Sequence, residues 1–168
     1  MGKIPDIKKM HKIIDNFIET NLIEKIKSVC LSSDFAWYYT PYVSNKDAGD
    51  GVYFSHLVYN NFSPTSNCFN LFVPILDFLN AKSLIRIKIN MFSRTPELFK
   101  HDWHCDYDFD HKGAVIYLNS NDGFTILEDN TMVNSLENRI LLFDSSKPHR
   151  STTCTDQGVR LTVNFNYF

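Results

Sequence analysis

The chain has 168 residues, the usual size of one domain, and can bury a hydrophobic core without disulfides or structural metals. Its 17 basic and 19 acidic residues give a formal net charge of -2, so no field of one sign exists to attract nucleic acid or an anionic membrane. Aromatic residues make up 14%, which excludes a disordered chain and is typical of sheet-rich proteins. We expect one globular domain over 1–168 that acts on a small molecule or a protein.

The cysteines and the N-terminus indicate a cellular location. The four cysteines, at 30, 68, 105 and 154, form no Cys-x-x-Cys pair, which argues against a zinc knuckle and favours reduced thiols. The stretch "MGKIPDIKKMHKIIDNF" lacks the apolar core of a secretion signal, and Asp6 stands where a myristoylation motif needs Ser or Thr. No run of eighteen apolar residues occurs. These features predict a soluble, cytoplasmic protein.

The first elements expected in the front half, about 1–82, are a helix and two strands. Apolar residues at helical spacing after a cap-like Asn21 predict a helix over 22–31. The aromatic and β-branched runs at 35–43 and 51–59, separated by the turn-rich "SNKDAGD", predict two strands.

A second helix is predicted near 67–81. Its apolar residues recur at i, i+3, i+4, i+7 and i+10, which is the buried face of a helix. Pro74 must kink this helix or lie near its start, because proline has no amide hydrogen and a fixed φ.

The half after Ser83, about 83–168, consists of short strand-like runs separated by Asn-Asp-Gly and Ser-Ser-Lys-Pro turns. The runs are "LIRIKINMF", "AVIYLN", "FTILED", "ILLFDSS" and "VRLTVNFNYF". The expected fold class is therefore mainly β with N-terminal helices, built as helices in front of a sandwich or barrel.

The stretch "HDWHCDYDFDH" is rich in the residue types that bind metals through nitrogen and oxygen. His104 and Asp106 are two apart, so in an extended segment both side chains point to one face and can reach one ion, while Cys105 points away. His149, on a turn after the strand "RILLF", offers a third ligand. Two histidines and one carboxylate leave coordination positions open, as in non-haem Fe(II) oxygenases, whereas a structural zinc needs four ligands.

The last strand offers a carboxylate site. Alternation along "VRLTVNFNYF" places Arg160, Thr162 and Asn164 on one face of the strand. If that face lines the interior, the guanidinium can bind a carboxylate through two hydrogen bonds and never loses its charge.

Together these residues resemble the iron(II)- and 2-oxoglutarate-dependent dioxygenases, and most of all their prolyl-4-hydroxylase-type branch. The resemblance rests on His-Cys-Asp at 104–106, the distal His149, Arg160 eleven residues later, "AVIYLN", "DGFT" and "RLTVNFNYF". It covers roughly 84–168, and no match is found for the front half.

The resemblance implies a double-stranded β-helix, or jelly-roll, and a complete cofactor set. Fe(II) would be held by His104, Asp106 and His149, and 2-oxoglutarate would bind the iron and Arg160, with dioxygen in the last position and ascorbate in support. The outcome would be hydroxylation of a C–H bond in a peptidyl residue, proline-type, or in a small molecule, with release of succinate and CO2.

The family pattern leaves open which further residues contact the cosubstrate. Tyr117 matches a tyrosine that in some members binds the cosubstrate carboxylate, and Thr162 matches the hydroxyl of an Arg-x-Ser pattern. Tyr117 could equally be core filler. Phe92 stands where this branch often has a tyrosine, which removes one cosubstrate hydrogen bond. Because Asp106 is present, hydroxylation is favoured over halogenation.

The other residues of this stretch are not expected to bind the metal. His101 and His111 are expected to be solvated loop residues, and Asp108 and Asp110 surface charges. Trp103 is expected to pack against its neighbours.

Two alternatives stay open. A cupin-like metal-binding module without oxygenase activity would share the fold and ligands but would not need Arg160. A nucleobase-dealkylating oxygenase is disfavoured by the net charge, although the basic residues of 86–100 keep it open. No membrane partner is expected, and the oligomeric state is not indicated.

Overall fold

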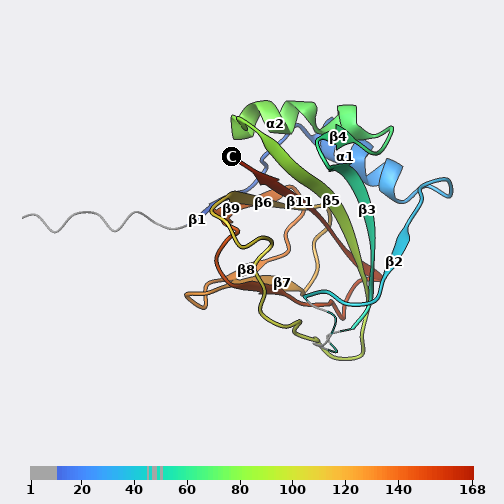
Figure 1. Cartoon of the computed structure of the whole chain (residues 1–168). Coiled ribbons are helices and arrows are strands. Elements are labelled where there is room, and N and C mark those ends of the chain that lie inside the picture. The colour runs from blue at the N-terminus through green and yellow to red at the C-terminus, as the bar shows by residue number, and fades with distance from the viewer. Residues whose placement is uncertain (1–10, 45, 47–48, 50) are drawn as a thin grey trace, which may run out of the picture.

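Residues 11–44, 46, 49 and 51–168 are described by a computed structural model of the chain, and Figure 1 shows their arrangement. The lipidation and signal-peptide arguments fall largely on residues 1–10, which lie outside the described residues, as do several positions of the loop 44–50. No helix among the described residues is long and apolar enough to cross a bilayer.

The larger of two sheets has eight strands in the order β1-β9-β6-β11-β5-β3-β2, with β4 paired to β3, and all its pairs are antiparallel. Its strands are β1 (His11–Ile14), β2 (Tyr38–Thr40), β3 (Tyr53–Asn60), β4 (Ser63–Pro64), β5 (Leu84–Ser93), β6 (Lys112–Tyr117), β9 (Arg139–Asp144) and β11 (Val159–Tyr167).

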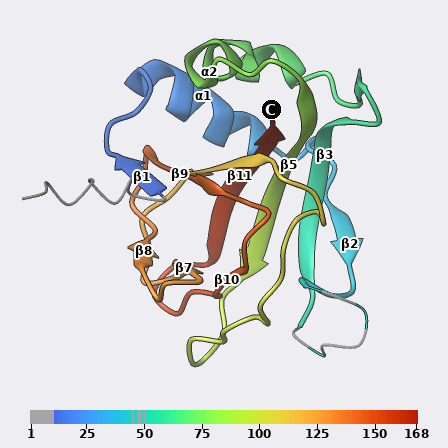
Figure 2. The ribbon, with the colours of Figure 1, turned by 60° about the vertical axis from the view of Figure 1, so that its left-hand side comes forward.

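The smaller sheet faces the larger one. Its order is β10-β7-β8, with β7 (Phe124–Leu127), β8 (Met132–Asn134) and β10 (His149–Ser151). Figures 1 and 2 show these strands on one side of the large sheet and the helices on the other. Two facing antiparallel sheets make the predicted jelly-roll core, which is mainly β as expected.

The helices are α1 (Thr20–Cys30) and α2 (Val73–Leu79), and α2 follows the 3-10 turn η1 (Phe69–Phe72). Pro74 lies in the first turn of α2, where its missing amide hydrogen leaves no helical bond unmade. The left-handed Asn80, with φ 48°, ends α2. Both predicted helices are thus confirmed, the second in two parts.

The main hydrophobic core lies between the helices and the large sheet. Buried residues of α1, such as Ile23 and Ile26, share this core with Leu161, Val163 and Phe165 of β11. The alternation predicted for β11 is confirmed, because these three residues face the helices while the residues between them face the small sheet.

Two local predictions need correction. The strand expected over 35–43 is limited to β2, an edge strand whose single neighbour is β3, while Trp37 donates its indole N–H to the carbonyl of Cys30. The strand β1 was not predicted, because its four residues have too short a pattern to show alternation and are ordered by pairing with β9.

Candidate active site

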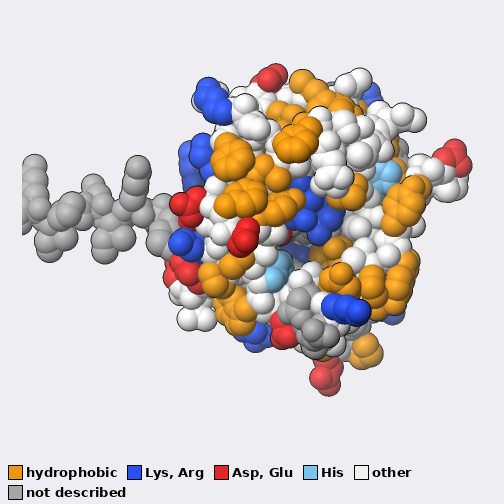
Figure 3. Space-filling model, viewed as in Figure 1, with side chains coloured by type: hydrophobic (Ala, Val, Ile, Leu, Met, Phe, Trp, Pro, Cys, Tyr) orange, Lys and Arg blue, Asp and Glu red, His pale blue; other side chains and the backbone are white. Residues whose placement is uncertain are grey.

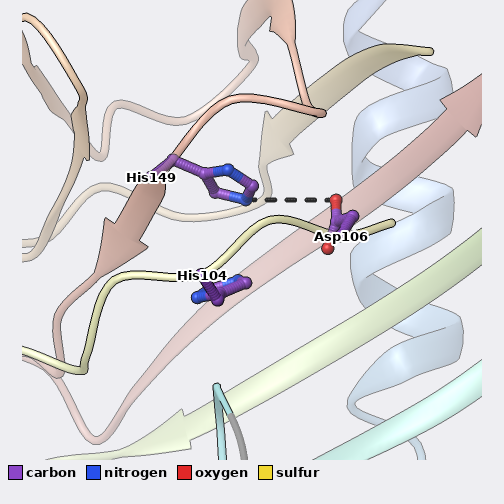
Figure 4. Close-up of side chains that lie close together, drawn as sticks. All are labelled: His104, Asp106 and His149. Atoms are coloured by element: carbon purple, nitrogen blue, oxygen red, sulfur yellow. Dashed lines mark ion pairs between the residues drawn. The ribbon is translucent and has the colours of Figure 1, made fainter. Parts of the chain in front are cut away.

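His104, Asp106 and His149 converge at one point between the two sheets. One ligand atom of each residue lies within 4.8 Å of the others (Figure 4). His149 begins β10, whereas His104 and Asp106 lie in the loop before β6 rather than in a regular strand. An antiparallel bridge aligns the two histidines, with the His104 N–H donating to the His149 carbonyl at 3.0 Å and the reverse bond at 2.9 Å. Cys105 is exposed, as predicted.

Backbone carbonyls orient both imidazoles. Nδ1 of His149 is 3.0 Å from the carbonyl of Lys147, and Nδ1 of His104 is 3.3 Å from that of Asp102. Each carbonyl accepts from an Nδ1–H, which assigns the lone pair to Nε2. In His149 this Nε2 lies 3.9 Å from Oδ2 of Asp106. Hydrogen bonds of this kind fix the orientation of an imidazole ring that would bind a metal.

Asp106 is held by three donors from separate strands and turns. Arg86 of β5 donates to Oδ1 at 3.0 Å, while Ser145 and Asn166 donate to Oδ2 at 2.5 and 2.8 Å. Burial by itself raises the pKa of this carboxyl, but the opposing positive charge of Arg86, with His149 and Lys88, holds it well below its usual range. Asp106 is therefore an ionised, fixed carboxylate near neutral pH.

His104 is a neutral imidazole at neutral pH. Burial, followed by the neighbouring His149, lowers the pKa of His104 to about 4, against the smaller opposing effect of Asp106. A histidine must lose its proton before it can bind a metal. In this environment His104 has already lost its proton well below pH 7.

The triad lines a pocket of about 470 Å³, counted with the solvent at its mouth, and Arg160 lines the same pocket. Figure 3 shows the hollow in the face toward the viewer, with a histidine visible inside it and hydrophobic side chains around it. The guanidinium of Arg160 is 1% exposed and pairs with no carboxylate among the described residues. A buried cation without an anion is costly, and a ligand carboxylate would supply the missing charge.

Hydroxyl groups hold Arg160 in place. Its Nε donates to Oγ of Ser135 at 2.9 Å, and its NH2 donates to Oγ1 of Thr125 at 3.2 Å. Tyr117 is fully buried and donates its hydroxyl hydrogen to the same Thr125 oxygen at 2.8 Å. Tyr117 thus lies behind the pocket and contacts Arg160 through Thr125 and through its ring, whose centroid is 5.6 Å from the guanidinium carbon.

Thr162 and Asn164 line the pocket beside Arg160, as the alternation predicted. Asn90 of β5 joins them, donating to Oγ1 of Thr162 at 3.4 Å and to Oδ1 of Asn164 at 3.2 Å. Phe92 is also in the pocket wall, stacked on Tyr53 with ring centroids 5.2 Å apart. Tyr53 therefore brings a hydroxyl from β3 into a wall where Phe92 has none.

The prediction for His101 and His111 was wrong. They are 2% and 5% exposed, respectively, because each packs against aromatic rings and finds a polar partner. Nδ1 of His101 is 2.8 Å from Oγ of Ser151, and Nδ1 of His111 is 2.8 Å from the carbonyl of Phe109. Neither joins the group of residues that could hold a metal.

The other motif residues lie at the surface. Asp108 and Asp110 are exposed, as expected. Trp103 is 39% exposed and packs under the guanidinium of Arg150, 4.5 Å from its ring centroid.

Sequence reasoning did not assign Arg86, Ser145 or Asn166 to the metal site, or Lys88 to the pocket. A signal was present in β5, where Arg86, Lys88 and Asn90 alternate with buried isoleucines. Such alternation indicates a polar face that lines a cavity or faces solvent. The sequence does not show which of the two applies.

The fold is shared with known enzymes. No family model matches the chain, and no curated protein matches it in sequence. Among solved structures, a Pseudomonas putida prolyl-4-hydroxylase has a TM-score of 0.65 at 12% identity, covering 94% of this chain and 92% of that one.

Two further solved structures give the same result. The viral collagen prolyl hydroxylase of Paramecium bursaria Chlorella virus-1, in its 2-oxoglutarate complex, has a TM-score of 0.64 at 12% identity, covering 95% and 96% of the two chains. A Trichoplax adhaerens prolyl hydroxylase in complex with a peptide fragment of hypoxia inducible factor has a TM-score of 0.66 at 14% identity, covering 96% and 84%. The chain therefore has the fold of the prolyl-4-hydroxylase-like, 2-oxoglutarate- and iron(II)-dependent oxygenases.

Proposed function

We propose that the protein is a non-haem Fe(II)- and 2-oxoglutarate-dependent oxygenase that hydroxylates a C–H bond and releases succinate and CO2. The observation that carries the proposal is the presence in one pocket of a two-histidine, one-carboxylate group and a buried guanidinium without a carboxylate partner. The first fits a redox-active iron with open positions, and the second fits the far carboxylate of the cosubstrate.

The roles of the residues follow from their contacts. His104, Asp106 and His149 would hold the iron, and Arg160 would bind the far carboxylate of 2-oxoglutarate. A bound iron would supply the site at which dioxygen reacts with 2-oxoglutarate, one oxygen atom entering succinate and the other the substrate. Ser135 and Thr125 keep the guanidinium in position. Thr162, Asn164 and Tyr117 complete the cosubstrate end, with Tyr117 acting through Thr125.

The substrate proposed is a peptidyl residue, proline-type, or a small molecule. The three structural neighbours described above are prolyl hydroxylases by name, and one of them carries a peptide fragment. Residues 1–168 would form one catalytic domain, since residues of the front half lie in the main core and Tyr53 lines the pocket. The four free cysteines support a cytoplasmic location.

A nucleic-acid substrate has little support. Arg86 is engaged with Asp106, and Lys88 lines the pocket. Two of the basic residues that kept that alternative open therefore lie inside the site rather than on a binding surface. The cupin-like module remains the competitor, and Arg160 is the residue that separates the two functions.

The test is anaerobic addition of Fe(II) and then 2-oxoglutarate to the purified protein. We expect the visible charge-transfer band of the iron chelate, and slow succinate formation with ascorbate once air is admitted. Asp106→Ala should abolish both signals. Cys105→Ser is the matched control, because Cys105 lies between the two ligands but is exposed. Metal binding without the band would leave the metal-binding module as the function.

A further inference from the structure

Lys88 is a second cation in the pocket, and the proposed reaction does not use it. It lies on β5 and is partly buried. The one hydrogen bond of its ammonium is donated to the hydroxyl of Tyr53, at 3.0 Å, and no carboxylate among the described residues lies within ion-pair distance. Asp106 is the only acidic residue among the described ones that line the pocket, and Arg86 already pairs with it.

Lys88 and Arg160 lie at different places along the sheet. In the register of β5 and β11, Arg160 is opposite Phe92, whereas Lys88 is opposite Asn164. Four residues of strand separate the two levels, about 13 Å. The two side chains also have different hydrogen-bond partners. Arg160 donates to Thr125 and lies against the small sheet, whereas the ammonium of Lys88 is directed toward Tyr53 on β3.

The loaded pocket would carry an excess of positive charge. In the proposed function, the charges of Fe(II) and 2-oxoglutarate cancel, and those of Arg86 and Asp106 cancel. This leaves Arg160 and Lys88, of which Arg160 would lie next to the cosubstrate carboxylate, whereas Lys88 has no carboxylate beside it among the described residues. A partly desolvated ammonium is stabilised by an anion, since charges interact more strongly away from bulk water.

We propose that Lys88, positioned by Tyr53, binds a carboxylate of the prime substrate on the β3 side of the metal site. The substrate would be an acid, either an acidic residue of a peptide or a small organic acid. This inference rests on the proposed function for the reaction, but the anion site itself depends only on Lys88 and its surroundings. Tyr53 itself lines the pocket, so the ammonium that it holds lies at the pocket wall.

Ligand-observed saturation-transfer NMR on protein holding redox-inert Zn(II) and saturating 2-oxoglutarate tests the site. The probes are two acids with their neutral twins: Nα-acetylglutamate α-amide against Nα-acetylglutamine α-amide for the peptide source, and butyrate against butyramide for the small-acid source. At least one acid should bind about tenfold more tightly than its twin, from one charge-assisted hydrogen bond.

Lys88→Met keeps the length of the side chain and removes the charge, so the preference should disappear. Lys25→Met, on the exposed face of α1, is the matched control and should retain it. The 2-oxoglutarate affinity of the Lys88 variant, read from the Fe(II) charge-transfer band, should stay within tenfold of the wild type.

Three results overturn the anion site. They are the absence of any acid preference in the wild type, a preference that persists in Lys88→Met, and a tenfold or larger loss of 2-oxoglutarate affinity in that variant. The second would mean that the acid binds the metal directly, and the third that Lys88 serves the cosubstrate. If the wild type shows no charge-transfer band, the oxygenase function fails, and the NMR comparison still decides the role of Lys88.

Discussion

Replacing Arg160 by methionine should have opposite effects on the free and the cosubstrate-bound protein. Methionine has a similar volume, a shorter reach and no charge. In the free protein, the substitution removes a buried cation that has hydroxyl partners but no carboxylate among the described residues. Replacement of buried ions by apolar groups of similar volume is often neutral or stabilising, so the free energy of unfolding should change little.

The bound protein should lose most of its ligand stabilisation. At a 2-oxoglutarate concentration about 100 times the dissociation constant, the wild type gains about 2.7 kcal/mol, or about 5–11 °C in Tm for a chain of this size. Removal of one partner of a buried ion pair costs about 3–5 kcal/mol, which weakens binding by a hundredfold or more. The same concentration should then stabilise the variant by about 0.4 kcal/mol or less.

Differential scanning calorimetry with Zn(II) in place of Fe(II) measures both quantities without turnover. Arg94→Met is the matched control, because Arg94 is exposed and lies outside the pocket. It should keep the full stabilisation by 2-oxoglutarate. The reasoning is refuted if Arg160→Met lowers the stability of the free protein by several kcal/mol and retains the ligand-induced rise in Tm, because Arg160 would then be a structural residue.

Three further changes test the surroundings of the triad. Gly113→Ala should weaken metal binding about tenfold in a calorimetric titration, because a Cβ there would lie 2.5 Å from Cβ of Ser145 and displace the hydroxyl that donates to Asp106, the proposed metal ligand. Lowering the pH from 6.5 to 4 should reduce the free energy of unfolding of the metal-free protein by at most about 3 kcal/mol through His104. The pKa of His104 in the folded protein, about 4, lies below its unfolded value, so the unfolded chain takes up the proton first. Tyr117→Phe should raise the half-saturating 2-oxoglutarate concentration about fivefold at nearly unchanged maximal rate, since Thr125 loses one hydrogen bond.

Each of these has a clear contrary result. Gly158→Ala adds a Cβ that meets nothing within 4 Å, so equal effects of the two glycine substitutions would disprove the close-contact argument. A His104→Asn variant whose unfolding free energy keeps the wild-type dependence between pH 6.5 and 4 would show that another group titrates there. A fall in maximal rate without a change in half-saturation would remove Tyr117 from the cosubstrate end.

The pairing of His104 with Asp106 could be predicted because its signal is local, a spacing of two residues. His149 and its spacing from Arg160 were recognised through the resemblance to the family pattern, while the face of Arg160 followed from the alternation of its strand. The alternation also placed Thr162 and Asn164 correctly. Such patterns report on backbone geometry over a few residues, and strands impose that geometry strictly.

The residues that hydrogen-bond to Asp106 could not be predicted, because they come from segments that are distant in sequence. Arg86 and Asn166 reach Asp106 across 20 and 60 residues of sequence. The burial of His101 likewise depends on a partner distant in sequence, Ser151 of β10, whose hydroxyl is 2.8 Å from its Nδ1. Hydrogen bonds of this kind are set by how strands are ordered in the sheet, and no short pattern records that order.

The strand β11 connects the stability of the fold to the geometry of the site. One of its faces carries Leu161, Val163 and Phe165 into the core under the helices, and the other carries Arg160 at one end and Asn166 at the other, about 20 Å apart. A slip of one residue in its pairing would exchange the two faces, burying polar groups under the helices and removing Arg160 from the pocket. The apolar face is therefore what holds the strand in register. The distance between Arg160 and Asn166, the donor to Asp106, is consequently set by packing on the opposite side of the sheet. If the proposed roles hold, core substitutions under α1 and α2 should change 2-oxoglutarate affinity as well as stability.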